Sequence, residues 1–163
     1  MKDIVKAGLG IIIAFLLYTI LSKISPPLLQ TLNIFTLVVI YFSIARGEIF
    51  GALLGAFCGL IQDSFSLGVF GISGLTKTVT GYLAGYISGK INVIPLARSF
   101  IFIFFMTSME LLLWIYLCSF IFSAGVNIGK GLSLFQPLNT AFLGSLLFLF
   151  LGKLKKNGKE QNL

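Results

Sequence analysis

The chain has 163 residues, of which 57% are hydrophobic and only 10% are charged. Soluble domains carry about 25% charged residues, so this composition excludes an ordinary water-soluble domain and predicts a surface that mostly faces hydrocarbon. A bilayer-spanning helix takes about 20 residues, and six such helices would use most of the chain. We therefore expect an all-α fold, a polytopic membrane protein with six transmembrane helices in one bundle.

The first predicted helix covers residues 4–21 and is followed by Pro26 and Pro27, which stop a helix. Its basic start and apolar run resemble a signal peptide, but no small-residue cleavage site follows, so we interpret it as a retained span. The later spans are predicted at 27–45, 49–62, 72–89, 99–122 and 132–151. The start of the second span is the least defined boundary: it falls between Pro27 and about Leu32, because Gln30, Thr31 and Asn33 make the first turns polar. The spans form one domain over residues 1–152, and we expect the basic tail, residues 153–163, to be disordered.

The basic residues predict the orientation, because Lys and Arg in short loops stay on the cytoplasmic side. Both termini are expected to be cytoplasmic, since nine of the twelve Lys and Arg residues then lie inside. Lys23 and Lys130 lie outside, and Lys77 falls within the fourth span. The net charge is +7. Because the topology already accounts for the scattered basic residues on the cytoplasmic side, we do not expect nucleic acid as a partner. The tail lysines could contact anionic lipid head groups of the bilayer.

Glycines recur every four residues on the third and fourth predicted helices. Residues four apart share one face of a helix, and small residues at this spacing allow helices in lipid to approach closely. The two stripes indicate either internal packing, which we favour as the main role, or a groove for the transmembrane helix of another protein. They comprise Gly47, Gly51, Gly55 and Gly59 on one helix, and Gly81, Gly85 and Gly89 on the other.

The chemical groups that most enzymes need are missing from the chain. It has no histidine and five acidic residues, of which only Asp63 and Glu110 are expected in or near the bilayer. This excludes a histidine dyad, and it leaves no cluster of acids for a metal site. Cys58 and Cys118 lie in separate apolar runs and are interpreted as reduced packing residues. We expect no catalytic residue, no cofactor and no metal.

Three ionisable residues nevertheless fall in or near the predicted bilayer. Asp63 and Lys77 stand fourteen positions apart around a Gly- and Ser-rich connection, and we expect either a contact between them or a lysine that extends to the head groups. A third hypothesis is that Asp63 caps the fourth helix or binds the amides of the connection. Glu110, near the middle of the fifth span, is expected to face the interior, either as a core polar group or as a contact for a ligand or partner helix.

Residues 47–90 contain a glycine-spaced helix that ends in GLIQD, an FG turn, and a following helix with L and GY. This pattern resembles the rod shape-determining protein MreD family. The matching residues are Gly55, Gly59, Asp63, Gly71, Leu75 and Tyr82. The hairpin before the third helix reads ARGE, where family members often carry a proline.

This resemblance implies a non-enzymatic scaffold of the bacterial cell-elongation machinery, in the plasma membrane, that supports peptidoglycan synthesis. The implied partners are the single-span protein MreC, the actin-like MreB, and RodA with its transpeptidase. The family also resembles the substrate-binding subunits of energy-coupling-factor transporters, so the alternative is a vitamin-binding subunit. The outer loops carry few polar groups for such a ligand, and small-molecule binding is left open.

Overall fold

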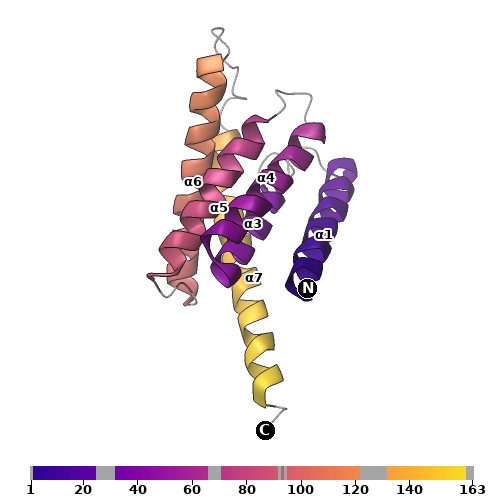
Figure 1. Ribbon diagram of the computed structural model, residues 1–163, viewed down its shortest axis with the longest axis vertical. Helices are drawn as coiled ribbons and strands as arrows, with labels where there is room; N and C mark the ends of the chain where they lie inside the picture. Colours follow the sequence, from indigo (N-terminus) through magenta and orange to yellow (C-terminus); the bar gives the residue numbers. More distant parts are fainter. Residues whose placement is uncertain are drawn as a thin grey trace.

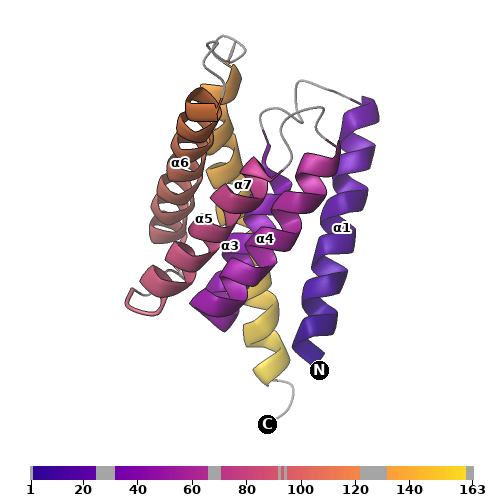
Figure 2. The same cartoon turned by 45° about the horizontal axis from the view of Figure 1, so that its top comes forward.

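The computed structural model describes residues 2–24, 32–65, 71–91, 93, 95–121 and 132–160, and these ranges form six α-helices without a strand. They are α1 (Lys2–Ile24), α3 (Ile34–Arg46), α4 (Glu48–Phe65), α5 (Ile72–Ser88), α6 (Leu96–Ile121) and α7 (Leu132–Glu160). The helices form one bundle, with α1 at one side and α6 at the opposite side (Figures 1 and 2). The expected all-α bundle of six helices is thereby confirmed for the described residues.

The short helix α3 is the centre of the bundle, because it contacts each of the other five helices. It begins after Asn33, whose side-chain oxygen accepts a hydrogen bond from the Thr36 amide at 3.3 Å. The expected span at 27–45 is therefore too long at its start, since the Asn33 cap makes Ile34 the first residue of α3. Residues 25–31 lie outside the described ranges. The 13 residues of α3 rise only about 20 Å.

Two apolar clusters pack on opposite sides of α3. Phe35 and Val39 lie with residues of α1 and α4, whereas Leu37 and Ile40 lie with residues of α5, α6 and α7. Alternate faces of one helix thus join the bundle into a single core. The remaining buried members are Ala14, Leu54 and Cys58 in the first cluster, and Ala84, Ile103, Met106 and Ala141 in the second.

The glycine stripes of α4 and α5 face each other and hold these helices in close contact. A Cβ atom added at Gly55 would meet the backbone of Lys77 and Thr78, and one added at Gly81 would meet the backbone of Gly51, each closer than 3.0 Å. Backbone atoms cannot yield as a flexible side chain can, so these positions require glycine. Gly59 and Gly85 make equivalent backbone approaches. The interpretation as internal packing is confirmed for Gly51, Gly55, Gly59, Gly81 and Gly85, which do not form an open groove. It does not extend to Gly47, where a Cβ atom would meet nothing within 4 Å, or to Gly89, where it would meet only the last turn of α5.

The outside of the bundle is strongly apolar. Among the described residues, large exposed apolar side chains outnumber buried ones and occur on α1 and on every helix from α4 to α7. Helix α6 is the one described helix that is both long and apolar enough to cross a membrane. Shorter apolar helical stretches occur at Gly8–Leu21, Ile34–Arg46 and Phe135–Phe150.

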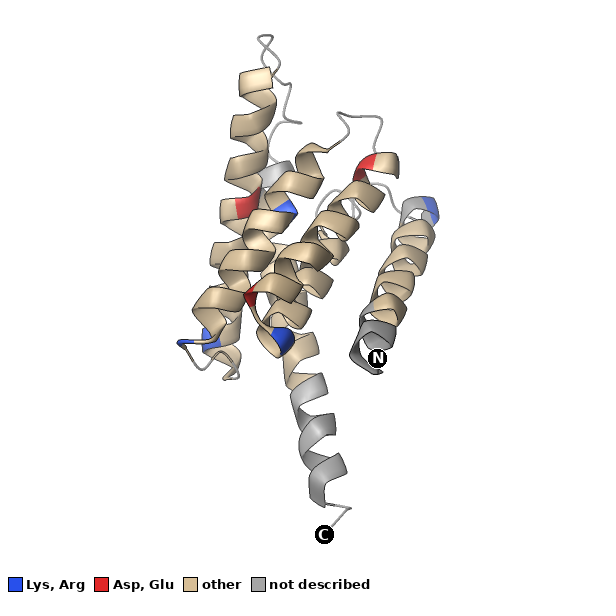
Figure 3. Cartoon of the chain, in the orientation of Figure 1, with Lys and Arg blue, Asp and Glu red and all other residues tan. Residues whose placement is uncertain are grey.

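The chain ends and most described basic residues lie at the same end of the bundle. Both termini are at the lower end in Figure 1, where α3 ends at Arg46 and α6 begins near Arg98. Lys23 ends α1 at the other end (Figure 3). Helix α7 continues to Glu160, so the expectation of a disordered tail is wrong up to that residue; the run around Lys153 to Lys156 is rich in good helix formers.

Candidate functional site

Lys77 lies in the interior of the bundle rather than at its surface. It belongs to the inward face of α5, between the buried residues Thr76 and Thr80, and only 1% of its surface is exposed. Its ammonium group forms an ion pair with the Glu110 carboxylate from α6. It also donates to the Thr36 hydroxyl at 2.9 Å and to the Asn33 side-chain oxygen at 3.3 Å. Three acceptors therefore match the three hydrogens of the ammonium group.

The Glu110 carboxylate uses its two oxygens unequally. Oε1 accepts from the Lys77 ammonium, from the Thr36 hydroxyl at 2.9 Å and from the Asn33 side-chain amide at 3.2 Å. Oε2 is buried and has no hydrogen-bond donor among the described residues. The charges of Lys77 and Glu110 cancel, so the interior contains a neutral pair instead of an isolated charge.

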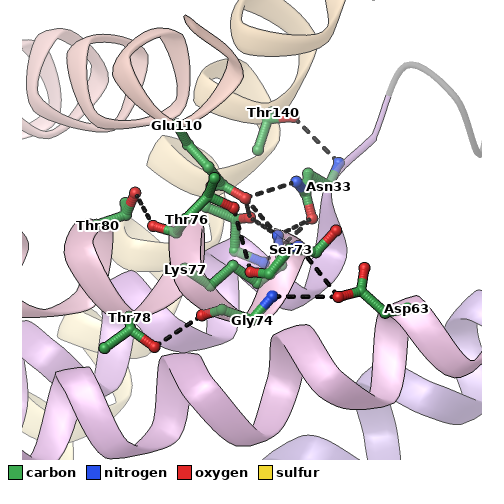
Figure 4. A network of polar contacts seen from close by, with 11 residues as sticks. Asn33, Asp63, Ser73, Gly74, Thr76, Lys77, Thr78, Thr80, Glu110 and Thr140 are labelled. Carbon is green, nitrogen blue, oxygen red and sulfur yellow. Dashed lines mark hydrogen bonds and ion pairs between the residues drawn. The ribbon is translucent and has the colours of Figure 1, made fainter. Parts of the chain in front are cut away.

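Asn33 (Figure 4) and Thr36 connect this pair to the rest of the bundle. The Asn33 backbone amide donates to the Thr140 hydroxyl of α7 at 3.2 Å. One polar network thus joins the start of α3 to α5, α6 and α7. Because each contact needs these helices in one register, the network specifies how four elements pack in the interior of the bundle.

Asp63, at the last turn of α4, caps the start of α5. Its Oδ2 atom accepts hydrogen bonds from the amides of Gly71, Ser73 and Gly74 at 2.8, 3.1 and 3.3 Å. The cap residue Gly71 has a φ of 101°, a conformation that favours glycine, and provides no side-chain cap of its own. Asp63 supplies the missing acceptor and places a negative charge at a helix N-terminus.

The expected contact between Asp63 and Lys77 is therefore wrong, as is a lysine that extends to the head groups. The Asp63 carboxylate accepts hydrogen bonds from backbone amides at the start of α5, whereas the Lys77 ammonium contacts α6 and the start of α3. The third hypothesis, that Asp63 caps the helix, is confirmed. For Glu110, the core-polar interpretation fits the observed contacts, with the added finding that one partner is charged.

The remaining predicted site residues divide between packing and the surface. Gly51, Gly55, Gly59, Gly81 and Gly85 lie between α4 and α5. Leu75 and Tyr82 are exposed, and the Tyr82 ring stacks against Tyr86 with centroids 6.4 Å apart. The structure therefore does not bring the predicted residues together in one site.

No family model, curated protein or solved structure matches this chain. Its function must accordingly be argued from the residues themselves. Within the described residues, no three His, Cys, Asp or Glu side chains gather as metal ligands. The polar network is instead a cluster of groups that largely satisfy one another.

Sequence reasoning missed three members of this network, Asn33, Thr36 and Thr140. Asn33 is polar, but in the sequence it indicates only a poorly defined start of the second span. Thr36 and Thr140 are single hydroxyl residues in apolar runs, and such residues usually bond to their own helix backbone. Polar residues within apolar runs are the signal that could have found them.

Proposed function

We propose that this chain is a multi-pass membrane protein with cytoplasmic termini, which acts as a non-enzymatic scaffold for partner helices in the bacterial cell-elongation machinery. The observation that carries the proposal is the inverted polarity of the bundle. Lys77, Glu110 and Asp63 are buried, whereas large apolar side chains cover the outside. In water this arrangement would leave hydrophobic surface exposed, but in a bilayer it is favourable.

The pairing of two of these buried charges also supports a bilayer location. A charged side chain at the centre of a bilayer costs roughly 2.5–3.5 kcal/mol on insertion scales, so such residues face the bundle interior and pair with one another. Lys77 and Glu110 do both. Helix α6 is long enough to cross a bilayer, because its 26 residues rise about 39 Å.

The scaffold role is supported by the resemblance of residues 47–90 to the MreD family and by the chemistry of the site. The polar network binds four elements of the chain together, and the glycine stripes are occupied by α4 and α5. A partner helix would therefore contact the apolar outside of the bundle. We propose the single-span protein MreC as that partner, with MreB and RodA with its transpeptidase in the same assembly.

A crosslinking scan in cells tests this proposal. A photoreactive residue is placed singly at exposed positions on five helices: Ile13, Phe57, Tyr82, Tyr116 and Phe142. We expect the single-span partner to be captured from one helix or two neighbouring helices, and depletion of the chain to make rod-shaped cells round. Capture from all five positions alike, or rods that keep their shape, would contradict the scaffold role.

The vitamin-binding alternative is tested with the same purified protein. A ligand that occupies a built site raises the melting temperature by mass action. A rise of several degrees with one vitamin, together with no captured single-span protein, would favour the transporter subunit. In the polar network, the groups other than Glu110 Oε2 bond to one another, which supports the scaffold instead.

A further inference from the structure

The turn between α5 and α6 combines basic and apolar exposed residues. Lys90 and Arg98 are exposed, and so are Ile91 and Leu96, at 53% and 44%. Val93, between them, is only 4% exposed, so the turn is anchored to the bundle. Basic groups beside exposed apolar side chains are typical of a polypeptide at the boundary between acyl chains and head groups.

Two exposed tyrosines of α5 and Lys90 form a row of contacts that ends at this turn. Tyr82 and Tyr86 stack nearly parallel, with an interplanar angle of 7°, and both are exposed. The Lys90 ammonium lies 4.2 Å from the centre of the Tyr86 ring and donates to its hydroxyl at 2.6 Å. Tyrosines with an apolar ring and a polar tip mark the level of the head groups. The eight positions from Tyr82 to Lys90 cover about 12 Å along the axis.

We propose that Lys90 and Arg98 form a binding site for the phosphate of an anionic phospholipid, with Tyr86, Ile91 and Leu96 beside its glycerol and acyl chains. The inference rests on the membrane location proposed above. Charge complementarity selects the anionic lipid, because the sequence has no acidic residue between Asp63 and Glu110. Three acidic residues of the described helices, Asp3, Glu48 and Glu160, belong to the end of the bundle where Arg46 also lies.

The described residues that flank positions 92 and 94 have defined backbone hydrogen bonds. The amides of Lys90 and Ile91 both donate to the Ile87 carbonyl, at 3.0 and 3.1 Å, and the Ser99 amide donates to the Pro95 carbonyl at 2.8 Å. The helix ends on both sides of the turn are therefore defined. Lys90 is further positioned by Tyr86, so less side-chain freedom is lost when a phosphate binds.

Native mass spectrometry of the full chain from bilayers of phosphatidylcholine and phosphatidylglycerol tests the proposal. We expect preferential retention of phosphatidylglycerol, and an affinity roughly thirtyfold lower in the double variant Lys90→Gln/Arg98→Gln, at about 1 kcal/mol for each basic residue. The matched control is Lys23→Gln/Lys130→Gln, which removes the same charge at positions expected on the opposite side. Its affinity should remain near that of the starting protein, and the preference should weaken at high salt.

Three results would overturn the assignment. They are equal retention of both lipids by the starting protein, an equal loss in the control variant, and displacement of the lipid by soluble glycerol phosphate. Carbonate extraction of cell membranes separates this inference from the proposed function. If the chain stays in the washed membrane but shows no lipid preference, only the lipid site fails, whereas release of the chain contradicts the membrane scaffold.

Discussion

At the scale of single residues, the main feature of the interior is the buried ion pair between Lys77 and Glu110. Each charge alone would be costly in an apolar core, and the pair is tolerated because Thr36 and Asn33 supply further hydrogen bonds. Such a pair contributes more to a defined arrangement of helices than to net stability, since an apolar replacement of both partners can be neutral.

The first prediction is a double-mutant cycle on this pair. Lys77→Met should lower the free energy of unfolding by roughly 3–5 kcal/mol, because it leaves the Glu110 carboxylate buried without its cation. Glu110→Gln should be similarly harmful, and the double variant should lose clearly less than the sum. Unfolding in mixed micelles by a denaturing detergent measures these values, with Lys23→Met as the exposed control. Additive losses would show that the two side chains act independently.

The second prediction separates a helix cap from an ion pair at Asp63. An asparagine keeps an oxygen that can accept from the amides of Ser73 and Gly74, so Asp63→Asn should cost less than about 1 kcal/mol of unfolding free energy. Asp63→Ala removes every acceptor and should cost about 2 kcal/mol or more, since buried amides are then left unpaired. The same detergent titration compares the two. Equal losses in both variants would indicate that the charge, and not the cap, is what matters.

At the scale of elements, the contact between α4 and α5 depends on the absence of side chains. The third prediction compares two glycine-to-alanine substitutions in helices. Gly55→Ala should destabilise the bundle by roughly 1–3 kcal/mol through overpacking, because its Cβ would meet the Lys77 backbone. Gly8→Ala is the matched control, as nothing lies within 4 Å of a Cβ atom there, and it should be near neutral. Equal losses of unfolding free energy in the two variants would contradict the claim that Gly55 is needed for close packing of α4 against α5.

At the scale of the whole molecule, the apolar outside of the bundle and the position of its basic residues are both expected of a membrane protein with one orientation. The fourth prediction is the topology: a reporter enzyme that works only outside the cytoplasm should be inactive when fused at residue 159 and active when inserted at residue 66, between α4 and α5. The reason is that basic residues gather at the end of the bundle with the termini (Figure 3). Activity at residue 159 would contradict the proposed orientation.

Much of the fold follows from the sequence because its causes are local. Apolar runs, breaks at proline and glycine, and the four-residue glycine spacing are properties of short segments, so α4 at Glu48–Phe65 and α5 at Ile72–Ser88 agree closely with the expected 49–62 and 72–89. The start of α3 was less predictable, since it depends on the Asn33 cap and on a contact with Thr140, 107 positions along the chain.

The amino-acid sequence by itself determined that the chain is helical, that its glycines serve close packing, and that three ionisable groups needed an explanation. Only the tertiary structure decided the partners of those groups. Lys77 stands fourteen positions from Asp63 and thirty-three from Glu110, yet it pairs with Glu110, because α5 turns this side chain towards α6 and α3 while Asp63 is held by the amides at the start of α5. The physical reason is that a buried charge takes the partner that helix packing brings within reach, and sequence distance does not measure that proximity.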